Sequence, residues 1–331
     1  MTNGENSMGK LPGIRDVWAA RSRISGSVVR TPLVRCPELS EEFDAEIYLK
    51  LELYQPIGAF KIRGAANKIL SLTIDQQRRG VATYSTGNHG LAVSYIAKQL
   101  GIPAYVFISN RVPQAKVKAL MSMGAILKIS GISQDEAGEY CYKLAAAKGL
   151  SVIEPFDDPH VIAGQGTIGL ELIEDCPGLD TVVVPLSGGG LIAGVALALK
   201  ATDANIRTIG VSMQEGAVMY HSIRQGKPVV LDEVDTLADS LLGGIGANNQ
   251  YSFPMVRQYV DDTVLVSESA IADGMAHLFK WHRLVAEGAS ATCVAALREK
   301  KVISPGSRAA LIISGRNVDA EAFIDATQPY L

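Results

Sequence analysis

A lysine set among apolar residues is the first group in this chain that could carry out covalent chemistry. Residues 53–66 read LYQPIGAFKIRGAA, so Lys61 lies between Phe60 and Ile62. Apolar surroundings disfavour the ammonium form and free the amine as a nucleophile, which can form a Schiff base with a carbonyl group. Most lysines are instead solvated surface groups, and the segment alone leaves both interpretations open.

A second group of polar residues occupies positions 84–90, which read YSTGNHG. They follow a predicted strand and open a predicted helix. Hydroxyl groups, a carboxamide and exposed backbone N–H groups at a helix N-terminus suit a small carboxylate. The alternative is an ordinary helix cap formed by Ser85, Thr86 or Asn88, with a structural role for His89.

A glycine-rich turn at residues 185–196 reads PLSGGGLIAGVA, between another predicted strand and helix. Glycines let the backbone approach a ligand, and amides at a helix N-terminus attract anions, which predicts a phosphate site. The spacing of Gly188, Gly190 and Gly194 roughly matches a dinucleotide-binding turn. That turn expects an acidic residue at the end of the next strand, where Ser212 stands. A cup for a smaller phosphorylated cofactor and a tight turn without a ligand are the other two interpretations.

Short β-branched runs alternate with longer amphipathic segments along the chain. Strands are predicted at 46–50, 81–84, 104–108, 126–129, 151–153, 181–184, 208–211, 263–266 and 310–313. Helices are predicted at 64–72, 90–100, 114–123, 134–148, 191–201 and 270–286. This alternation predicts an α/β fold with mostly parallel sheets covered by helices on both faces. Residues 231–252 have few periodic signals and predict a long loop, either functional or a plain surface connection.

Composition narrows the class of protein. The 331 residues suggest about two domains, and 47% hydrophobic with 20% charged residues excludes a largely disordered chain. A net charge of −3 gives no reason to expect a nucleic-acid or membrane-surface partner. No apolar run approaches the roughly 20 residues of a membrane span, and residues 1–10 lack the apolar stretch of a secretory signal. The four scattered cysteines predict neither a disulfide framework nor a zinc site and fit a reducing cytoplasm.

Together with Ser-Gly-Arg-Asn at 314–317, the three segments resemble the fold-type II pyridoxal-phosphate enzymes, and more narrowly the threonine/serine dehydratase and serine racemase family. The likeness runs from about residue 28 to 319, and four motifs in the same order are more specific than any one. It implies two open, mostly parallel twisted sheets covered by helices, similar to the tryptophan synthase β chain. It also implies a large domain of residues 1–71 and 156–331, a small domain of residues 72–155, and a cytoplasmic homodimer.

The resemblance further implies a role for each motif residue. Lys61 would hold pyridoxal 5'-phosphate as a Schiff base and abstract the Cα proton of the substrate. The other cofactor-binding residues would be Phe60 on the ring, Asn88 at the O3′ oxygen, Ser187, Gly188, Gly189, Gly190 and Leu191 around the phosphate, and Ser314 at the pyridine nitrogen. The substrate carboxylate would lie among Ser85, Thr86, Asn88 and His89. A serine is a weaker partner for the ring nitrogen than a carboxylate, which we expect to favour rapid loss of a β-hydroxyl group.

Several positions depart from the family pattern. Thr86 stands where the racemase has serine and dehydratases often have alanine, so an acid–base role opposite Lys61 and a capping role both stay open. Ser212 and Val218 stand where relatives often have acidic ligands, so no metal site is predicted. Arg316 replaces a glycine and would either bind a second anionic group of the substrate or point to solvent.

The sequence therefore predicts a pyridoxal-phosphate-dependent lyase that removes water from a β-hydroxy amino acid and yields a keto acid and ammonia. Leu-Leu-Gly-Gly-Ile-Gly at 241–246, with Thr86 and Arg316, resembles a subgroup of hydroxyectoine-utilisation dehydratases; a β-hydroxyaspartate-type substrate is an alternative. The chain ends soon after residue 317, so we expect no appended regulatory domain and a catabolic role. The rival functions are a serine or aspartate racemase using Lys61 and Thr86, an NAD-type oxidoreductase built on the turn at 188–194, and a non-catalytic binder.

Overall fold

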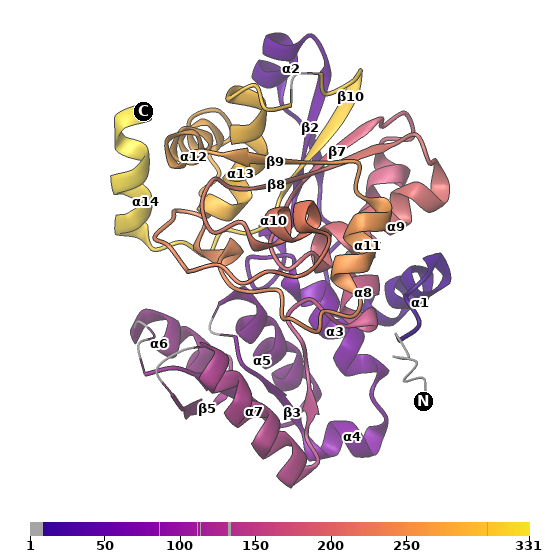
Figure 1. Ribbon diagram of the computed structural model, residues 1–331, viewed down its shortest axis with the longest axis vertical. Helices are drawn as coiled ribbons and strands as arrows, with labels where there is room; N and C mark the ends of the chain where they lie inside the picture. The colour runs from indigo at the N-terminus through magenta and orange to yellow at the C-terminus, as the bar shows by residue number, and fades with distance from the viewer. Residues whose placement is uncertain (1–8, 86, 111, 113, 132–133, 303) are drawn as a thin grey trace.

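The computed structural model describes residues 9–85, 87–110, 112, 114–131, 134–302 and 304–331, which form two sheets surrounded by helices (Figure 1). The larger sheet has the strand order β1-β2-β10-β7-β8-β9, and the smaller one has the order β5-β4-β3-β6. Among the described residues the strands of each sheet pair in parallel, except that β1 runs antiparallel to β2. The strands are β1 (Leu33–Arg35), β2 (Glu46–Leu51), β3 (Val81–Thr83), β4 (Ala104–Ile108), β5 (Ile126–Ile129), β6 (Ser151–Val152), β7 (Thr181–Pro185), β8 (Arg207–Met213), β9 (Asp262–Val266) and β10 (Arg308–Ile313).

Helices connect most of these strands and cover the sheets. The α-helices are α1 (Ile14–Ile24), α2 (Pro37–Phe43), α3 (Lys61–Ser71), α4 (Ile74–Arg79), α5 (Asn88–Leu100), α6 (Gln114–Ser122), α7 (Gln134–Lys148), α8 (Pro159–Asp175), α9 (Gly190–Thr202), α10 (Val218–Gln225), α11 (Ser252–Tyr259), α12 (Glu268–His282), α13 (Gly288–Arg298) and α14 (Ala320–Thr327). Short 3-10 turns add η1 (Glu52–Tyr54), η2 (Asp239–Leu241) and η3 (Gln328–Tyr330). No helix in the described part of the chain has both the length and the apolar character needed to cross a bilayer.

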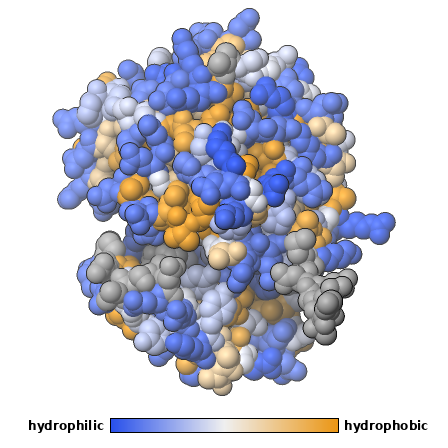
Figure 2. Space-filling view, in the orientation of Figure 1, coloured by the Kyte–Doolittle hydropathy of each residue, from blue (hydrophilic) through white to orange (hydrophobic). Residues whose placement is uncertain are grey.

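The six-stranded sheet is covered by helices on both faces. Successive side chains of its central strands point to opposite faces, so alternate residues pack against different helices. Leu311 and Ile313 of β10 join a cluster with residues of α12 and α13, whereas Ala310 and Ile312 join a cluster with residues of α8 and α9. Figure 1 shows this sheet and its helices in the upper part of the molecule. Figure 2 shows the same face mostly covered by hydrophilic residues, with hydrophobic residues gathered near its middle.

The four-stranded sheet lies below, with α5, α6 and α7 around it (Figure 1). Helix α3 packs against α5 and also against α8, so it joins the two sheets. Ile62 and Ile69 of α3 lie in one hydrophobic cluster with Val81 of β3 and Val93 of α5. The first residue of α3 is Lys61, so this residue lies at the junction of the two sheets.

The predicted fold class is confirmed, and the predicted strands agree with the structure to within two residues at each end. Helix prediction was less complete, because α1, α2, α4, α8, α10, α11, α13 and α14 were not predicted, and the short strand β1 was also missed. The helix predicted at 270–286 ends at His282 because Arg283 is left-handed (φ 58°). All four strands of the smaller sheet fall within residues 72–155, but its hydrophobic cluster includes residues on α3, before that boundary. The exact division into two domains stays a prediction.

Candidate active site

Three neighbouring parallel strands, β2, β10 and β7, direct their carboxyl ends to the same edge of the larger sheet. Open α/β sheets place ligands at this edge. The segment leading to Lys61 follows β2, Ser314 follows β10, and the glycine turn at 187–191 follows β7. The parallel topology thus gathers three of the four sequence motifs at one place.

Lys61 is the first residue of α3, and its position is set by backbone contacts with the end of β10. Ala59 forms an isolated antiparallel bridge with Gly315, and the Phe60 N–H donates to the Ser314 carbonyl at 2.9 Å. The Lys61 side chain is partly buried, and its Nζ donates to the Pro155 carbonyl at 2.8 Å. Burial lowers the pKa of Lys61 to about 8, although the charge of Glu287 acts in the opposite direction.

The glycine turn has no space for side chains. A Cβ at Gly188 would lie 2.4 Å from the Phe156 ring, and one at Gly190 would lie 2.8 Å from the Phe156 carbonyl oxygen. Gly189 caps α9 with a φ of 86°, a left-handed conformation that favours glycine. The turn therefore offers bare backbone at the N-terminus of α9, which suits a phosphate group. The glycine turn and Lys61 contact two consecutive residues. Phe156 packs against the turn, and the carbonyl of Pro155, the residue before it, accepts the hydrogen bond from Lys61 Nζ, so the turn lies close to Lys61.

The side chain of Asn88 links a helix of the smaller sheet to residues that follow strands of the larger sheet. It is the first residue of α5, and its Nδ2 donates to both carboxylate oxygens of Glu287, at 3.0 and 3.1 Å. Its Oδ1 accepts from Asn317 Nδ2 at 2.6 Å, and the same Nδ2 donates to the Ile57 carbonyl at 2.9 Å. Glu287 and Asn317 thus hold one buried carboxamide in place, and Ile57 in turn holds Asn317.

Glu287 is a site residue that sequence reasoning missed. It caps α13 and is 3% exposed, and burial raises its pKa to about 7, although the Asn88 hydrogen bond opposes that rise. Its N–H donates to the Gly315 carbonyl at 3.2 Å, and a Cβ at Gly315 would lie 2.7 Å from its Oε1. The sequence offers no distinctive motif around Glu287, because its importance comes from its contact with Asn88, 199 positions away.

Ser314 is 2% exposed and has its own buried partner, Ser290 of α13, with their Oγ atoms 3.0 Å apart. Ser290 Oγ also accepts from the Gly315 N–H at 2.6 Å and donates to the Gly315 carbonyl at 2.7 Å. A serine hydroxyl has one proton, so Ser314 is the donor in the serine pair. An Oγ lone pair of Ser314 is then left to accept a further hydrogen bond.

The remaining predicted site residues differ in how they are placed. His89 is 1% exposed, and its Nε2 lies 3.0 Å from the Ile153 carbonyl; burial lowers its pKa to about 3. The ring is therefore neutral and holds the start of α5 against the end of β6. Ser85 is partly buried before α5, and Arg316 is exposed. Thr86 lies outside the described residues.

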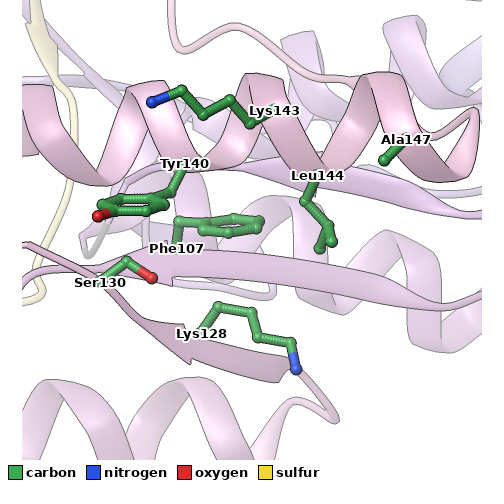
Figure 3. Close-up of a pocket in the computed structure, with 7 residues that line it drawn as sticks. All are labelled: Phe107, Lys128, Ser130, Tyr140, Lys143, Leu144 and Ala147. Carbon is green, nitrogen blue, oxygen red and sulfur yellow. The ribbon is translucent and has the colours of Figure 1, made fainter.

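A hollow of about 420 Å³ lies elsewhere, on the smaller sheet (Figure 3). Side chains from α7 face strand residues Phe107 and Lys128 across it, as Figure 3 shows. Its lining residues are Phe107, Lys128, Ser130, Tyr140, Lys143, Leu144 and Ala147. None of the predicted site residues is among these seven, so the hollow is separate from the Lys61 site.

The residues at this edge fit pyridoxal phosphate. A bare glycine turn at a helix N-terminus suits its phosphate, a lysine with a lowered pKa suits its aldehyde, and a buried hydroxyl and carboxamide suit its polar ring atoms. Comparison with known families agrees, since the model of the pyridoxal-phosphate dependent enzymes matches residues 24–315. The chain belongs to this family, as a fold-type II member of its threonine dehydratase and serine racemase group.

Individual relatives cover nearly the whole chain. A putative threonine dehydratase of Sinorhizobium fredii is 47% identical over 306 residues, 92% of each chain. An L-threonine ammonia-lyase of Thermotoga maritima is 40% identical over 92% of this chain and 76% of the relative. Among solved structures, maize serine racemase has a TM-score of 0.90 and 33% identity, covering 97% of this chain and 98% of its own. The family match overturns the dinucleotide interpretation of the glycine turn.

Proposed function

We propose that this protein is a pyridoxal-phosphate-dependent dehydratase that removes water from a β-hydroxy amino acid and yields a keto acid and ammonia. The observation that carries the proposal is the amine of Lys61, with its pKa lowered to about 8, anchored beside a glycine turn that is bare of side chains. The reaction class is supported by relatives named as threonine dehydratases and ammonia-lyases.

In this proposal Lys61 holds the cofactor and moves the proton. When bound, pyridoxal phosphate supplies an electron sink for negative charge at the substrate Cα. The Nζ of Lys61 accepts the Cα proton, and a pKa of about 8 leaves a substantial neutral fraction at neutral to mildly alkaline pH. The β-hydroxyl group would then leave as water with the proton that Lys61 had accepted, and a water molecule would hydrolyse the product to the keto acid and ammonia.

The remaining cofactor contacts follow the sequence prediction. Residues 187–191 would bind the phosphate, Phe60 would pack on the ring, and Ser314 and Asn88 would bind the ring nitrogen and the O3′ oxygen. The hydrogen bond that Asn88 donates to Glu287 and the one that it accepts from Asn317 support its part, because they fix the orientation of the carboxamide. Ser290 supports the part of Ser314 by fixing its hydroxyl through the contact between their Oγ atoms, which leaves an Oγ lone pair to accept from a protonated ring nitrogen.

We place the substrate carboxylate at the N-terminus of α5, near Ser85, Thr86 and Asn88. The neutral, buried ring of His89 is held by its contact with the Ile153 carbonyl and carries no charge to attract the carboxylate. We therefore assign any contact of His89 with the carboxylate to its backbone. Arg316 is exposed, which favours contact with solvent or with a second anionic group at the mouth of the site. The proposed cytoplasmic location is consistent with the four cysteines, which are all free and buried.

Threonine and serine are the first substrates to test, because the relatives described above are named for them. Hydroxyectoine-related compounds and β-hydroxyaspartate rest on the sequence departures at Thr86, Arg316 and 241–246 alone. A serine racemase is the second candidate, favoured by 34% identity over 322 residues to serine racemase of Oryza sativa. A homodimer stays an expectation drawn from the family.

The decisive experiment incubates the holoenzyme with each candidate substrate and measures keto acid, ammonia and the chirality of the remaining amino acid. We expect equimolar keto acid and ammonia from at least one β-hydroxy amino acid. Arg316→Gly should change the ranking of substrates that carry a second carboxylate and leave the others unchanged. Racemisation without keto acid would replace the dehydratase by the racemase, and inactivity on every compound in a protein that holds the cofactor would overturn both.

A further inference from the structure

A compact group of four side chains with metal-binding atoms lies away from the Lys61 site. Cys36 and Glu38 come from the start of α2, and His277 and His282 come from the last two turns of α12. One ligand atom from each residue lies within 4.8 Å of all the others. Figure 1 shows α2 and α12 in the upper part of the molecule, far from the lower sheet with α6 and α7.

The individual separations are close to those that a tetrahedral zinc ion would impose. Bond lengths of about 2.0–2.3 Å at tetrahedral angles place ligand atoms about 3.3–3.6 Å apart. Cys36 Sγ lies 3.4 Å from Glu38 Oε1 and 3.2 Å from His282 Nε2. His277 Nε2 lies 3.6 Å from the same Oε1. The His282 Nε2 to Glu38 Oε1 separation is 2.5 Å, so this hydrogen bond would open by about 0.8 Å around an ion.

The His277 ring gives a second, independent reason to expect a ligand. The residue is 6% exposed, and its buried Nε2 has no hydrogen-bond partner among the described residues. A buried polar atom without a partner is costly, and an imidazole nitrogen aimed at a thiol, a carboxylate and a second imidazole is a ready metal ligand.

We propose that Cys36, Glu38, His277 and His282 form a zinc-binding site that ties α2 to α12. A set of one sulfur, two imidazole nitrogens and one carboxylate oxygen selects Zn²⁺ over Mg²⁺ or Ca²⁺, which prefer oxygen ligands alone. Binding replaces the Cys36 thiol proton, which goes to solvent, and the thiolate and the carboxylate neutralise the two charges of the ion. Four protein ligands complete a tetrahedron, so the site is structural rather than catalytic.

The position of the site explains what the ion would stabilise. Cys36 belongs to the same hydrophobic cluster as Met275 and Leu278 of α12 and Leu39 of α2. Helix α2 spans only seven residues and leads directly into β2, the strand that precedes Lys61. A zinc ion at this point would fasten a short helix onto the face of the larger sheet that α12 covers.

The spacing of residues along the chain hides this group, since Cys36 and His282 are 246 positions apart. That separation is why the cysteine pattern alone predicted no zinc site. The competing interpretation is a hydrogen-bonded cluster of thiol, carboxylate and imidazoles that binds no metal, and the experiment below distinguishes the two.

The test uses the holoenzyme, freed of metal by a chelator and titrated with Zn²⁺ or Co²⁺. We expect about one Zn²⁺ per chain, a higher thermal unfolding temperature with Zn²⁺, and a Co²⁺ spectrum with a thiolate charge-transfer band and the intense visible bands of tetrahedral geometry. Cys36→Ser should abolish the charge-transfer band and weaken Zn²⁺ binding at least tenfold. His277→Gln should weaken binding similarly but keep the charge-transfer band.

Matched controls keep the outcome informative. Cys176→Ser removes another buried cysteine, and His160→Gln removes another histidine, so neither should change metal binding. Folding of every variant is checked by circular dichroism and by the visible absorbance of the bound cofactor. Absence of stoichiometric Zn²⁺ binding, or equal binding by the Cys36→Ser variant, would overturn the proposal.

Discussion

Lys50 and Lys61 lie on either side of the turn after β2, and their surroundings differ sharply. Lys50 is fully buried, and its Nζ lies 2.7 Å from Glu171, 3.6 Å from Asp175 and 2.8 Å from the Thr31 carbonyl oxygen. Lys61 is partly buried, and its Nζ donates to a carbonyl oxygen, with no carboxylate within ion-pair distance among the described residues. Burial acts on both amines, but among the described residues only Lys50 forms ion pairs that compensate it, whereas Glu287 acts on Lys61 from beyond ion-pair distance.

The comparison teaches that burial alone does not make a lysine nucleophilic. The carboxylates near this part of the chain are already engaged, because Arg63 binds Glu52 and Glu171 through short hydrogen bonds. Arg63 stands two positions after Lys61 in the Phe-Lys-Ile-Arg-Gly motif and is itself fully buried. The motif thus contains a lysine without an ion pair among the described residues and a buried arginine that pairs with Glu52 and Glu171.

The largest effect should come from removing the reactive amine. We expect Lys61→Ala to lower kcat/KM at least about 1,000-fold, because proton transfer and covalent attachment are both lost. Lys61→Arg keeps the positive charge and should be equally inactive. The measurement is keto-acid formation, with unfolding temperature as the control for folding. Activity within tenfold of the unmodified enzyme would remove Lys61 from the mechanism.

The next largest effect should be on stability, at Lys50. Lys50→Met leaves Glu171 and Asp175 without one buried partner, and breaking a buried ion pair costs about 3–5 kcal/mol. Lys116→Met breaks an exposed pair with Asp239 and should cost about 0–1 kcal/mol. Urea unfolding of the two variants measures the difference. Equal losses of unfolding free energy in the two variants would mean that the buried Lys50 ion pairs stabilise the fold no more than an exposed pair does.

A smaller effect should be visible in the pH dependence of cofactor loading. The pKa of Lys61 is lowered to about 8, so the neutral amine of the apoprotein increases about tenfold per pH unit below pH 8 and levels off above it. The rate at which apoprotein incorporates pyridoxal phosphate should follow this curve. A profile that continues to rise to pH 10 would show an ordinary lysine instead.

The smallest effect concerns Glu287, whose pKa is raised to about 7 mainly by burial. A carboxyl group with a raised pKa costs the folded state stability as the pH rises from the unfolded pKa, near 4.3, to about 7. Glu287→Gln should therefore raise the unfolding temperature of the apoprotein by a few degrees at pH 8, and by less as the pH is lowered. The same increase at every pH would assign the effect to packing rather than to charge.

Much of this molecule could be predicted from its sequence because the local signals agree with the fold. β-branched runs marked nine strands, and the three motifs that follow β2, β10 and β7 meet at one edge because parallel strands force them to. Helix α8 was missed since Gly164, Gly166 and Gly169 weaken its helical pattern. In the structure these glycines allow close packing, and a Cβ at Gly164 would lie 2.5 Å from the Arg63 carbonyl oxygen.

The parts that could not be predicted depend on contacts between distant residues. Glu287 acquires its raised pKa and its Asn88 contact only when α13 meets α5. The group of Cys36, Glu38, His277 and His282 likewise forms only when α12 covers the sheet beside α2. In both cases the residue types are ordinary in the sequence, and burial and proximity give them chemical meaning.

The central claim is that Lys61, and not the more deeply buried Lys50, carries the cofactor. The most direct test treats the holoenzyme with borohydride and maps the reduced, phosphopyridoxyl-labelled peptide by mass spectrometry. The account predicts one labelled peptide with the modification on Lys61, and loss of the visible absorbance band on reduction. Label on Lys50 or on any other lysine, or no label in an active enzyme, would contradict it.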